Sequence, residues 1–251
     1  MDLGLSGKKA VITGATKGIG RSIAETLLAE GASVAICARD AAGVEAAVEE
    51  MSALGNVFGA SVDAADGDAV EAWVASAAEQ LGGIDIYVHN TSGKPARKIE
   101  NWINNFNIDL MAMVRGVGAA SEALSEGGGA VISIGTTATA EHFASGSNSY
   151  SAFKSAVTNW TLGQAQVLGA KGVRCNVVSP GPIFVEGGDW NMIKDNMTEF
   201  YEATEKVHPQ GHLGTVQDVA NVVAFLASDA ARHVNGVNVT VDGGFLKRID
   251  F

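Results

Sequence analysis

Short runs of nearly continuous apolar residues recur along this chain. Each is followed by a longer stretch in which apolar residues return every three or four positions. An apolar run of roughly four to eight residues fits a strand that is covered on both faces. Seven strands are expected, at Lys8–Thr13, Ser33–Ala38, Val57–Ser61, Ile84–His89, Ala130–Gly135, Val173–Val178 and Val237–Val241.

The stretches between these strands have the period of amphipathic helices. Alternation of strand and helix predicts a three-layer, doubly wound α/β fold, in which helices cover both faces of a parallel sheet. The sequence Thr215-Val216-Gln217-Asp218 indicates a helix start with an acidic first turn. Helices are expected at Gly18–Glu30, Ala41–Leu54, Asp66–Leu81, Arg97–Ser125, Asn148–Ala170 and Thr215–Ala227.

The chain has 251 residues, which fits one domain spanning residues 1–251. Residues 180–214 depart from the alternation, since they are polar, hold several glycines and prolines, and predict one helix near Met192–Lys206. An insertion at the carboxyl edge of such a sheet is a usual place for a substrate lid. We therefore expect a lid at about 180–214.

The formal net charge is −11. An acidic surface repels nucleic acid and anionic lipid, so neither is an expected partner. The first residues lack the layout of a signal peptide, and no apolar run approaches the roughly 18 residues of a membrane span, which favours the cytoplasm. Cys37 and Cys175 fall on strands too far apart for a disulfide and are expected to be reduced core thiols.

A glycine-rich turn, Thr13-Gly14-Ala15-Thr16-Lys17-Gly18-Ile19-Gly20, joins the first strand to the first helix. Its three glycines let the backbone turn tightly and approach a pyrophosphate at the helix N-terminus. The spacing Gly-x-x-x-Gly-x-Gly differs from the commonest dinucleotide fingerprint, but the strand–turn–helix setting is the one that such a site needs. The alternative is an ordinary glycine-rich turn.

The end of the second strand should reach the adenosine ribose. An NAD site usually has an acidic residue there, whereas this chain has Ala38 at that position, followed by Arg39. Arginine matches a 2′-phosphate in geometry and charge, and Lys17 offers a second cation. We expect NADP(H) rather than NAD(H), with two alternatives: Asp40 reaches the ribose, or both cations are solvated surface charges.

Downstream, Tyr150-Ser151-Ala152-Phe153-Lys154 offers a proton donor with a cation beside it. Residues four apart on a helix share one face. A free tyrosine has a pKa of about 10, and we expect the Lys154 ammonium and an oxidised nicotinamide to lower the pKa of Tyr150. The alternative is a surface tyrosine with a chance lysine neighbour.

These motifs together resemble the short-chain dehydrogenase/reductase family in its single-domain form, similar to carbonyl reductases of the 3-oxoacyl-acyl-carrier-protein reductase type. Further matches are Asp63 after the third strand, the sequence His89-Asn90-Thr91-Ser92-Gly93, the sequence Ser179-Pro180-Gly181-Pro182, and Val241-Asp242-Gly243-Gly244. The resemblance implies a Rossmann fold with strand order 3-2-1-4-5-6-7 and a homotetramer, or a homodimer, built on the two long helices. It also implies a cofactor site formed by Gly14, Thr16, Lys17, Gly18, Ile19, Gly20, Arg39, Asp63, Asn90, Tyr150, Lys154, Pro180, Gly181 and Ile183.

Two of the family's four catalytic positions differ here. Thr136 stands where the family has serine after the fifth strand; Thr137 is the alternative if the register slips by one, and Ser133 lies too far inside the strand. Asp109 stands where the family has an asparagine that holds a water next to the lysine. Asp109 can also accept from a water, but it brings a negative charge near Lys154.

The resemblance implies an oxidoreductase that moves a hydride between a nicotinamide and a ketone or secondary alcohol. Tyr150 would exchange the proton, Lys154 would assist it and Thr136 would polarise the carbonyl. Alternatives are a dienoyl or enoyl thioester reductase, favoured by Asp109, and a catalytically silent NADP(H) sensor. No metal site is expected, because Pro209 and Gly211 interrupt the pair His208 and His212.

Overall fold

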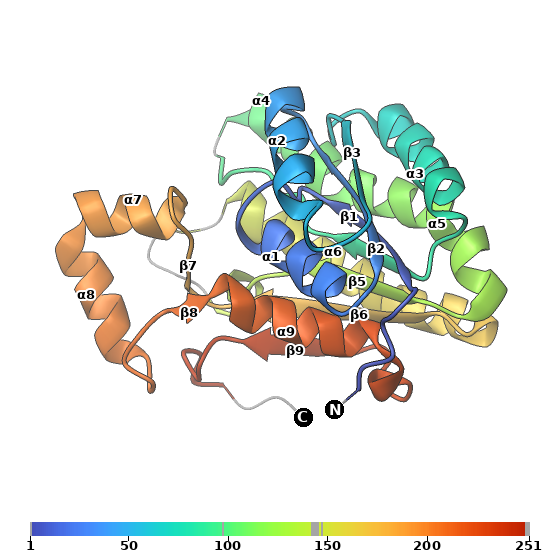
Figure 1. Cartoon of the computed structure of the whole chain (residues 1–251). Helices are drawn as coiled ribbons and strands as arrows, with labels where there is room; N and C mark the ends of the chain where they lie inside the picture. Colours follow the sequence, from blue (N-terminus) through green and yellow to red (C-terminus); the bar gives the residue numbers. More distant parts are fainter. Residues whose placement is uncertain (1, 97, 142–145, 147, 249–251) are drawn as a thin grey trace.

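A computed structural model describes residues 2–96, 98–141, 146 and 148–248. Its centre is a parallel sheet of seven strands in the order β3-β2-β1-β4-β5-β6-β9 (Figure 1). The predicted order is confirmed, with β9 as the seventh strand of the sheet. The strands are β1 (Lys9–Thr13), β2 (Ser33–Ala38), β3 (Val57–Ser61), β4 (Ile86–His89), β5 (Ala130–Ile134), β6 (Arg174–Pro180) and β9 (Asn238–Val241).

Helices cover both faces of the sheet and give the predicted three layers. One buried apolar cluster lies between the sheet and helices α1, α2 and α9, and a second lies between the sheet and α3, α5 and α6. These helices are α1 (Gly18–Ala29), α2 (Ala41–Met51), α3 (Gly67–Leu81), α5 (Ala112–Gly127), α6 (Ser149–Leu168) and α9 (Val216–Ala227).

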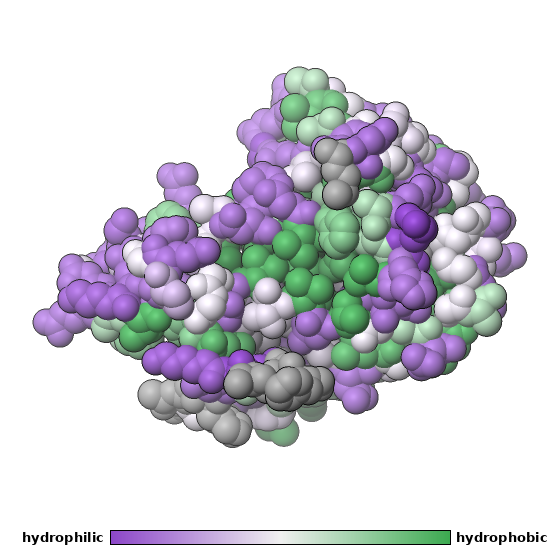
Figure 2. Space-filling model, turned by 90° about the horizontal axis from the view of Figure 1, so that it is seen from below, coloured by the Kyte–Doolittle hydropathy of each residue, from purple (hydrophilic) through white to green (hydrophobic). Residues whose placement is uncertain are grey.

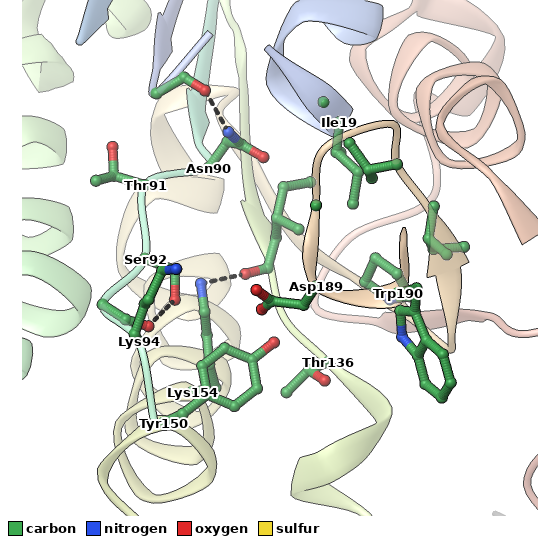
Figure 3. Close-up of a pocket in the computed structure, with 18 of the residues that line it drawn as sticks. Ile19, Asn90, Thr91, Ser92, Lys94, Thr136, Tyr150, Lys154, Asp189 and Trp190 are labelled. Atoms are coloured by element: carbon green, nitrogen blue, oxygen red, sulfur yellow. Dashed lines mark hydrogen bonds between the residues drawn. The ribbon is translucent and has the colours of Figure 1, made fainter. Parts of the chain in front are cut away.

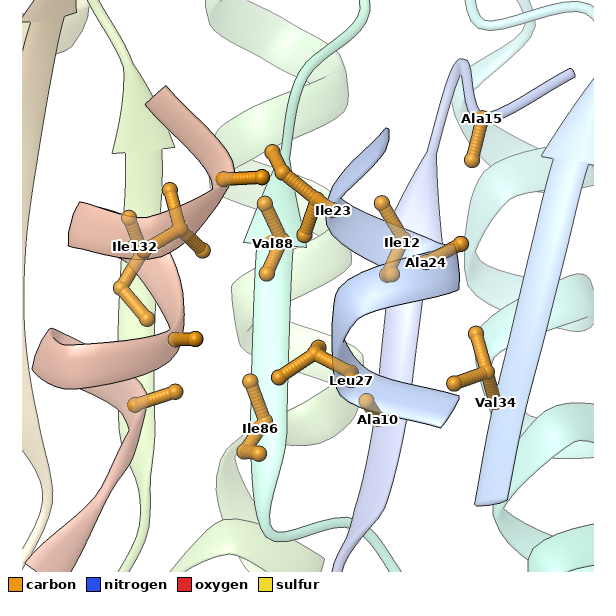
Figure 4. Packing of buried hydrophobic residues seen from close by; sticks show 14 of the residues in the cluster. Ala10, Ile12, Ala15, Ile23, Ala24, Leu27, Val34, Ile86, Val88 and Ile132 are labelled. Atoms are coloured by element: carbon orange, nitrogen blue, oxygen red, sulfur yellow. The ribbon is translucent and has the colours of Figure 1, made fainter. Parts of the chain in front are cut away.

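Alternation along the strands divides the core between the two faces. On β1, Ile12 packs into the cluster under α1, whereas Val11 packs into the cluster on the opposite face. Figure 4 shows Ile23 and Leu27 of α1 directed onto β1 and β4. Because both faces are buried, the strands are apolar nearly throughout, which is why the sequence pattern located them within about two residues.

The predicted helix Arg97–Ser125 is wrong as a single α-helix, and Arg97 itself lies outside the described residues. The segment consists of α4 (Ile99–Asn105), a π-helical stretch η1 (Phe106–Met111) and α5. An apolar period does not reveal a π-helical stretch, because one wider turn leaves the flanking pattern almost unchanged. Such turns occur frequently at functional sites, and this one contains Asp109.

Residues 180–214 form two helices where one was predicted. A short parallel pair, β7 (Ile183–Phe184) with β8 (Gly214–Thr215), brackets α7 (Asp189–Asn196) and α8 (Thr198–Val207). The backbone at Met197 (φ −140°) leaves the helical region and separates the two helices. In Figure 1 both helices project beyond the sheet as a separate layer.

The helix start predicted at Thr215–Asp218 is confirmed as a capping box, in which the Thr215 hydroxyl accepts from Asp218 N–H and the Asp218 carboxylate accepts from Thr215 N–H. Three 3₁₀ turns complete the chain: η2 (Thr137–Thr139), η3 (Gly169–Lys171) and η4 (Asp229–Ala231).

Both cysteines are free and buried, as expected. Burial raises the pKa of each thiol to about 12, which leaves Cys37 and Cys175 protonated and unreactive at neutral pH. Among the described residues, none of the helices combines the length and the apolar composition that a membrane crossing requires.

One face of the molecule has exposed apolar side chains. Figure 2, which views the molecule from below, shows hydrophobic residues gathered near the centre of the face where Figure 1 has β9 and α9. The exposed hydrophobic residues in this region include Phe225 of α9 and Val237, which directly precedes β9.

Candidate active site

A cavity of about 1100 Å³ opens at the carboxyl ends of the strands, between the glycine-rich turn, the loop after β4, the start of α6 and residues 180–214. Nearly all of the predicted site residues line it. Gly20 and Asp109 do not, because both lie behind its wall. The predicted residues that line the cavity are Gly14, Thr16, Lys17, Gly18, Ile19, Arg39, Asp63, Asn90, Thr136, Tyr150, Lys154, Pro180, Gly181 and Ile183.

The glycine-rich turn leaves the first N–H groups of α1 open toward this cavity. Gly14 and Gly18 have φ values of +66° and +60°, a left-handed conformation that favours glycine. The N-cap residue of α1 is Lys17, whose side chain makes no capping hydrogen bond, and the first turn of α1 has no acidic residue. The uncapped donors and the positive end of the helix dipole suit a phosphate group.

Gly20 has a packing role beneath the turn. A side chain at this position would collide with the Asn90 amide and the Gly14 carbonyl, which are themselves joined by a hydrogen bond of 2.7 Å from Asn90 Nδ2 to Gly14 O. The absence of a side chain therefore lets the loop after β4 dock against the phosphate turn.

Replacing Gly20 with alanine should destabilise the protein by about 2 kcal/mol, because overpacking a tight contact typically costs 1–3 kcal/mol. Urea denaturation would measure the change. Gly163→Ala on α6 is the matched control, since a side chain there meets no atom within 4 Å. It should stabilise the helix by about 0.5–1 kcal/mol. Equal effects at the two positions would contradict the packing role.

The adenosine end of the cavity is cationic. Lys17 and Arg39 both line it and are exposed, and within the described part of the chain neither forms an ion pair. Asp40 does not line the cavity, because its carboxylate lies against Gly43 at the start of α2. Asp40 is therefore poorly placed to take the role of the missing ribose acid.

Three side chains meet at the inner end of the cavity (Figure 3). Tyr150 and Lys154 project from one face of α6, and Thr136 follows β5. The hydroxyls of Thr136 and Tyr150 both face this end of the cavity, and Lys154 Nζ donates to the Ile134 carbonyl at 2.8 Å. Ser133 instead bonds Thr161 in the core at 3.0 Å. Thr137 also lines the cavity, but Thr136 is the threonine beside Tyr150, which agrees with the predicted register.

The expected lowering of the Tyr150 pKa is wrong for the protein alone. Burial raises the pKa of Tyr150, the nearby Thr136 hydroxyl opposes that rise, and the negative charges of Asp109 and Asp189 add to it. Lys154 is turned toward Asp109 and Ile134 and does not neutralise a phenolate. Tyr150 is therefore a protonated hydroxyl at neutral pH, ready to donate.

Asp109 is fully buried behind the cavity wall, in the π-helical stretch. Its Oδ1 accepts from Ser92 Oγ at 2.7 Å and lies 3.7 Å from Lys154 Nζ, while Oδ2 accepts from Gly93 N–H at 3.1 Å. Burial raises the pKa of Asp109, and Lys154, Ser92 and Gly93 oppose that rise. Burial lowers the pKa of Lys154, and Asp109 opposes it. The two groups thus form a buried ion pair that protein donors hold in place.

His89 supports this pair from the end of β4. Burial lowers the pKa of His89 to about 3, so the ring is neutral. Its Nε2 lies 3.0 Å from the Asp109 carbonyl oxygen and donates to it. Thr13 Oγ1 accepts from the N–H groups of Asn90 and Thr91, which leaves its own proton to reach His89 Nδ1 at 3.5 Å.

Sequence reasoning gave two cavity residues no role in the chemistry. Ser92, the main side-chain partner of Asp109, stands where the family sequence Asn-Asn-Ala-Gly has glycine, and that departure was the available signal. Asp189, at the start of α7, approaches Tyr150 only because the 180–214 segment folds over the cavity. Composition alone could not assign its direction.

Comparison with known proteins gives the same picture. The family described as enoyl-(acyl carrier protein) reductase matches residues 14–246. The isoepoxydon dehydrogenase patN of Aspergillus clavatus is 36% identical over 248 residues, covering 96% of this chain and 95% of its own. A short chain dehydrogenase from Burkholderia cenocepacia, solved in complex with NADP, superposes with a TM-score of 0.88 at 32% identity, covering 96% of this chain and 98% of that one.

The chain belongs to the short-chain dehydrogenase/reductase family. L-Sorbose reductase from Gluconobacter frateurii, solved with NADPH and L-sorbose, is another similar member, with a TM-score of 0.90, 29% identity and coverage of 99% and 100% of the two chains. Members of the short-chain dehydrogenase/reductase family with this likeness are named dehydrogenases and reductases, and this chain is an oxidoreductase of the same kind.

Proposed function

We propose that this protein is an NADP(H)-dependent carbonyl reductase or alcohol dehydrogenase acting on a ketone or a secondary alcohol. The observation that carries the proposal is the pair of neighbouring hydroxyls of Tyr150 and Thr136 at the inner end of the cavity, with Lys154 on the same helix face as Tyr150. Two hydroxyls directed at one space can hold a carbonyl oxygen.

In this proposal each residue has one task. The Tyr150 hydroxyl donates its proton to the carbonyl oxygen during reduction and takes it back during oxidation. The Thr136 hydroxyl stabilises charge on the same oxygen. Ile134 and Asp109 hold Lys154 in place, and its ammonium group would lie beside the ribose of the nicotinamide. The nicotinamide, when bound, supplies or accepts the hydride.

The residues present fit such a cofactor. The uncapped N-terminus of α1 would hold the pyrophosphate, and Asn90, Pro180, Gly181 and Ile183 would form the wall at the nicotinamide end. Arg39 and Lys17 would hold a 2′-phosphate, and Asp63 would contact the adenine. The unpaired cations and the turned-away Asp40 favour NADP(H) over NAD(H).

We assign Asp109 a positioning role. It does not face the cavity, so it acts through Lys154 by keeping that buried amine protonated. Ser92 and the Gly93 N–H keep the carboxylate ionised in turn. The buried ion pair takes the place of the family's asparagine and its water.

Replacing Asp109 with asparagine should lower kcat about 10-fold and move the alkaline loss of carbonyl reduction to lower pH. Reduction needs protonated Tyr150 and protonated Lys154, and the Asp109 charge raises the pKa of both groups. Without that charge both pKa values fall, so the activity is lost earlier as pH rises. The pH profile of kcat measures the shift. Asp68→Asn, the same change at an exposed carboxylate, should not move it; an unmoved limb in Asp109→Asn would refute the role.

Two alternative functions can be distinguished from this proposal by experiment. Reduction of a carbon–carbon double bond is favoured by Asp109 and by the description of the matched family, but Tyr150 and Thr136 are arranged to hold a carbonyl oxygen. A silent sensor would bind NADPH and consume none. The test is NADPH consumption by the purified protein with ketones, oxo-esters and a dienoyl thioester. Turnover of the thioester alone, or of none, would overturn the proposal.

We also propose that residues 180–214 act as the substrate lid of a single domain. Trp190, Met192 and Phe200 line the cavity from this segment and give it an apolar wall. The glycine at position 187, with φ of +67° and no neighbour that a side chain would meet, offers a hinge before α7.

A homo-oligomer built on the long helices fits the exposed surface. Ile99 and Ile103 on α4 are 68% and 60% exposed, and Val167 on α6 is 62% exposed. Apolar side chains this open are typical of surfaces covered by another subunit. Light scattering should give the mass of a tetramer or dimer, and Ile103→Asp should reduce it. A monomeric parent would contradict this.

A further inference from the structure

Asp189 is a carboxylate from the lid that faces the reacting groups. It lines the same cavity as Tyr150, Lys154 and Thr136, and Figure 3 shows its carboxylate oxygens directed at the space between these three side chains. The chemistry described so far gives Asp189 no task. A carboxylate in this position determines what can bind beside the carbonyl.

Within the described residues, no protein group pairs with the Asp189 carboxylate. Among the residues that the structure describes, the Asp189 side chain makes no hydrogen bond and no ion pair, and Lys154, which lines the same cavity, is committed to Asp109 and Ile134. A carboxylate accepts hydrogen bonds only, and its bonds with hydroxyl donors are among the stronger ones. We therefore expect a ligand that donates a hydrogen bond to the Asp189 carboxylate.

Aromatic packing holds this part of the lid together. The ring of Trp190 stacks on Phe200 with centroids 6.1 Å apart, and it meets the edge of Tyr201 at 6.4 Å. Lys194 lies 5.5 Å from the centre of the Tyr201 ring. Asp189 directly precedes this cluster at the start of α7, so the packing of α7 on α8 holds its backbone beside the cavity.

We propose that Asp189 forms a substrate subsite that accepts a hydrogen bond from a hydroxyl on the carbon next to the reacting carbonyl. The substrates are then neutral α-hydroxy ketones and, in the reverse direction, the corresponding vicinal diols. This inference rests on the proposed carbonyl chemistry. Tyr150 and Thr136 hold the reacting oxygen, and Asp189 holds its neighbour from the lid side.

The same charge excludes anions. A 2-oxo acid has its carboxylate bonded directly to the carbonyl carbon, where it would meet the like charge of Asp189 at close range. Lys94 lines the cavity from the loop after β4 and is the group through which an anion could still be attracted. A test should therefore compare three substrates, in which the group bonded to the reacting carbonyl is a methylene, a hydroxyl-bearing carbon or a carboxylate.

The experiment compares kcat and KM of the full-length protein with NADPH and three probes: 2-butanone, 3-hydroxy-2-butanone and 2-oxobutanoate. The parent should prefer the hydroxy ketone over butanone by about 10- to 100-fold in kcat/KM, the range for a hydrogen bond to a charged group. Asp189→Ala should reduce the ratio to near 1, mainly through the KM of the hydroxy ketone. Asp189→Asn, which keeps an acceptor, should retain a few-fold preference.

The matched control is Glu186→Gln, which removes a negative charge from the same cavity-lining segment and should keep the parent's preference. Both Asp189 variants should accept 2-oxobutanoate better than the parent does, and unchanged NADPH binding would show that they are folded. A hydroxyl preference that survives in Asp189→Ala, or is absent in the parent, overturns the subsite while leaving the carbonyl chemistry intact. Failure of the parent with every carbonyl overturns both.

Discussion

Replacing Tyr150 with phenylalanine should lower kcat for carbonyl reduction by about 1,000-fold, within the range of a lost general acid. The ring, its packing and the Lys154–Asp109 pair stay in place, so only the hydroxyl and its proton disappear. Steady-state kinetics at saturating ketone would measure the loss, and NADPH binding, followed by fluorescence titration, should stay within a few-fold of the parent.

The matched control is Tyr87→Phe, because the Tyr87 hydroxyl is buried in the core and has no hydrogen-bond partner among the described residues. Removing that hydroxyl should leave kcat unchanged. A Tyr150→Phe enzyme that keeps its rate within a few-fold of the parent would show that the proton comes from another group.

Reversing the charge at Arg39, as Arg39→Asp, should weaken NADPH binding about 100-fold and leave NADH binding little changed or improved. The side chain is exposed at the adenosine end of the cavity, without an ion pair in the described structure, so its contribution goes to the ligand. A charge-assisted hydrogen bond contributes about 1.5–3 kcal/mol, which corresponds to roughly 10- to 150-fold, and an aspartate adds repulsion toward the phosphate.

Titration of the free protein with each cofactor measures this preference. Arg232→Asp, a charge reversal at another exposed arginine outside the cavity, should change neither affinity. Equal weakening of NADH and NADPH by Arg39→Asp would mean that the arginine contacts a group common to both cofactors, and the preference for NADP(H) would lose its support.

The fold could be predicted from the sequence because its signals are local. Strands buried on both faces are apolar at nearly every position, so the places of the seven strands of the main sheet follow from the pattern, whereas the two-residue strands β7 and β8 do not. The sheet order was implied by the family resemblance, because an apolar run does not indicate which other strand it pairs with. The two helices of the 180–214 segment were predicted as one, because the break at Met197 is a single non-helical residue within a stretch of helical period.

The candidate site could be predicted where a residue's role depends on its own element. Tyr150 and Lys154 share a face by helical spacing, and the glycine turn follows from its position between β1 and α1. The interactions that tune the site are long-range. Ser92 meets Asp109 across 17 positions of the chain and Asp189 reaches Tyr150 from the lid, so the direction of the Tyr150 pKa could not be read from the Tyr-x-x-x-Lys spacing.

The most direct test of the account follows deuterium from NADPH labelled at C4 of the dihydronicotinamide. The parent protein is incubated with each labelled epimer and either 3-hydroxy-2-butanone or a dienoyl thioester, and the products are examined by NMR and mass spectrometry. The account predicts that one epimer delivers deuterium to the carbinol carbon and that Tyr150→Phe nearly abolishes the transfer. Deuterium found only on the carbon skeleton of an unsaturated thioester, or bound NADPH that delivers none to any carbonyl, would contradict it.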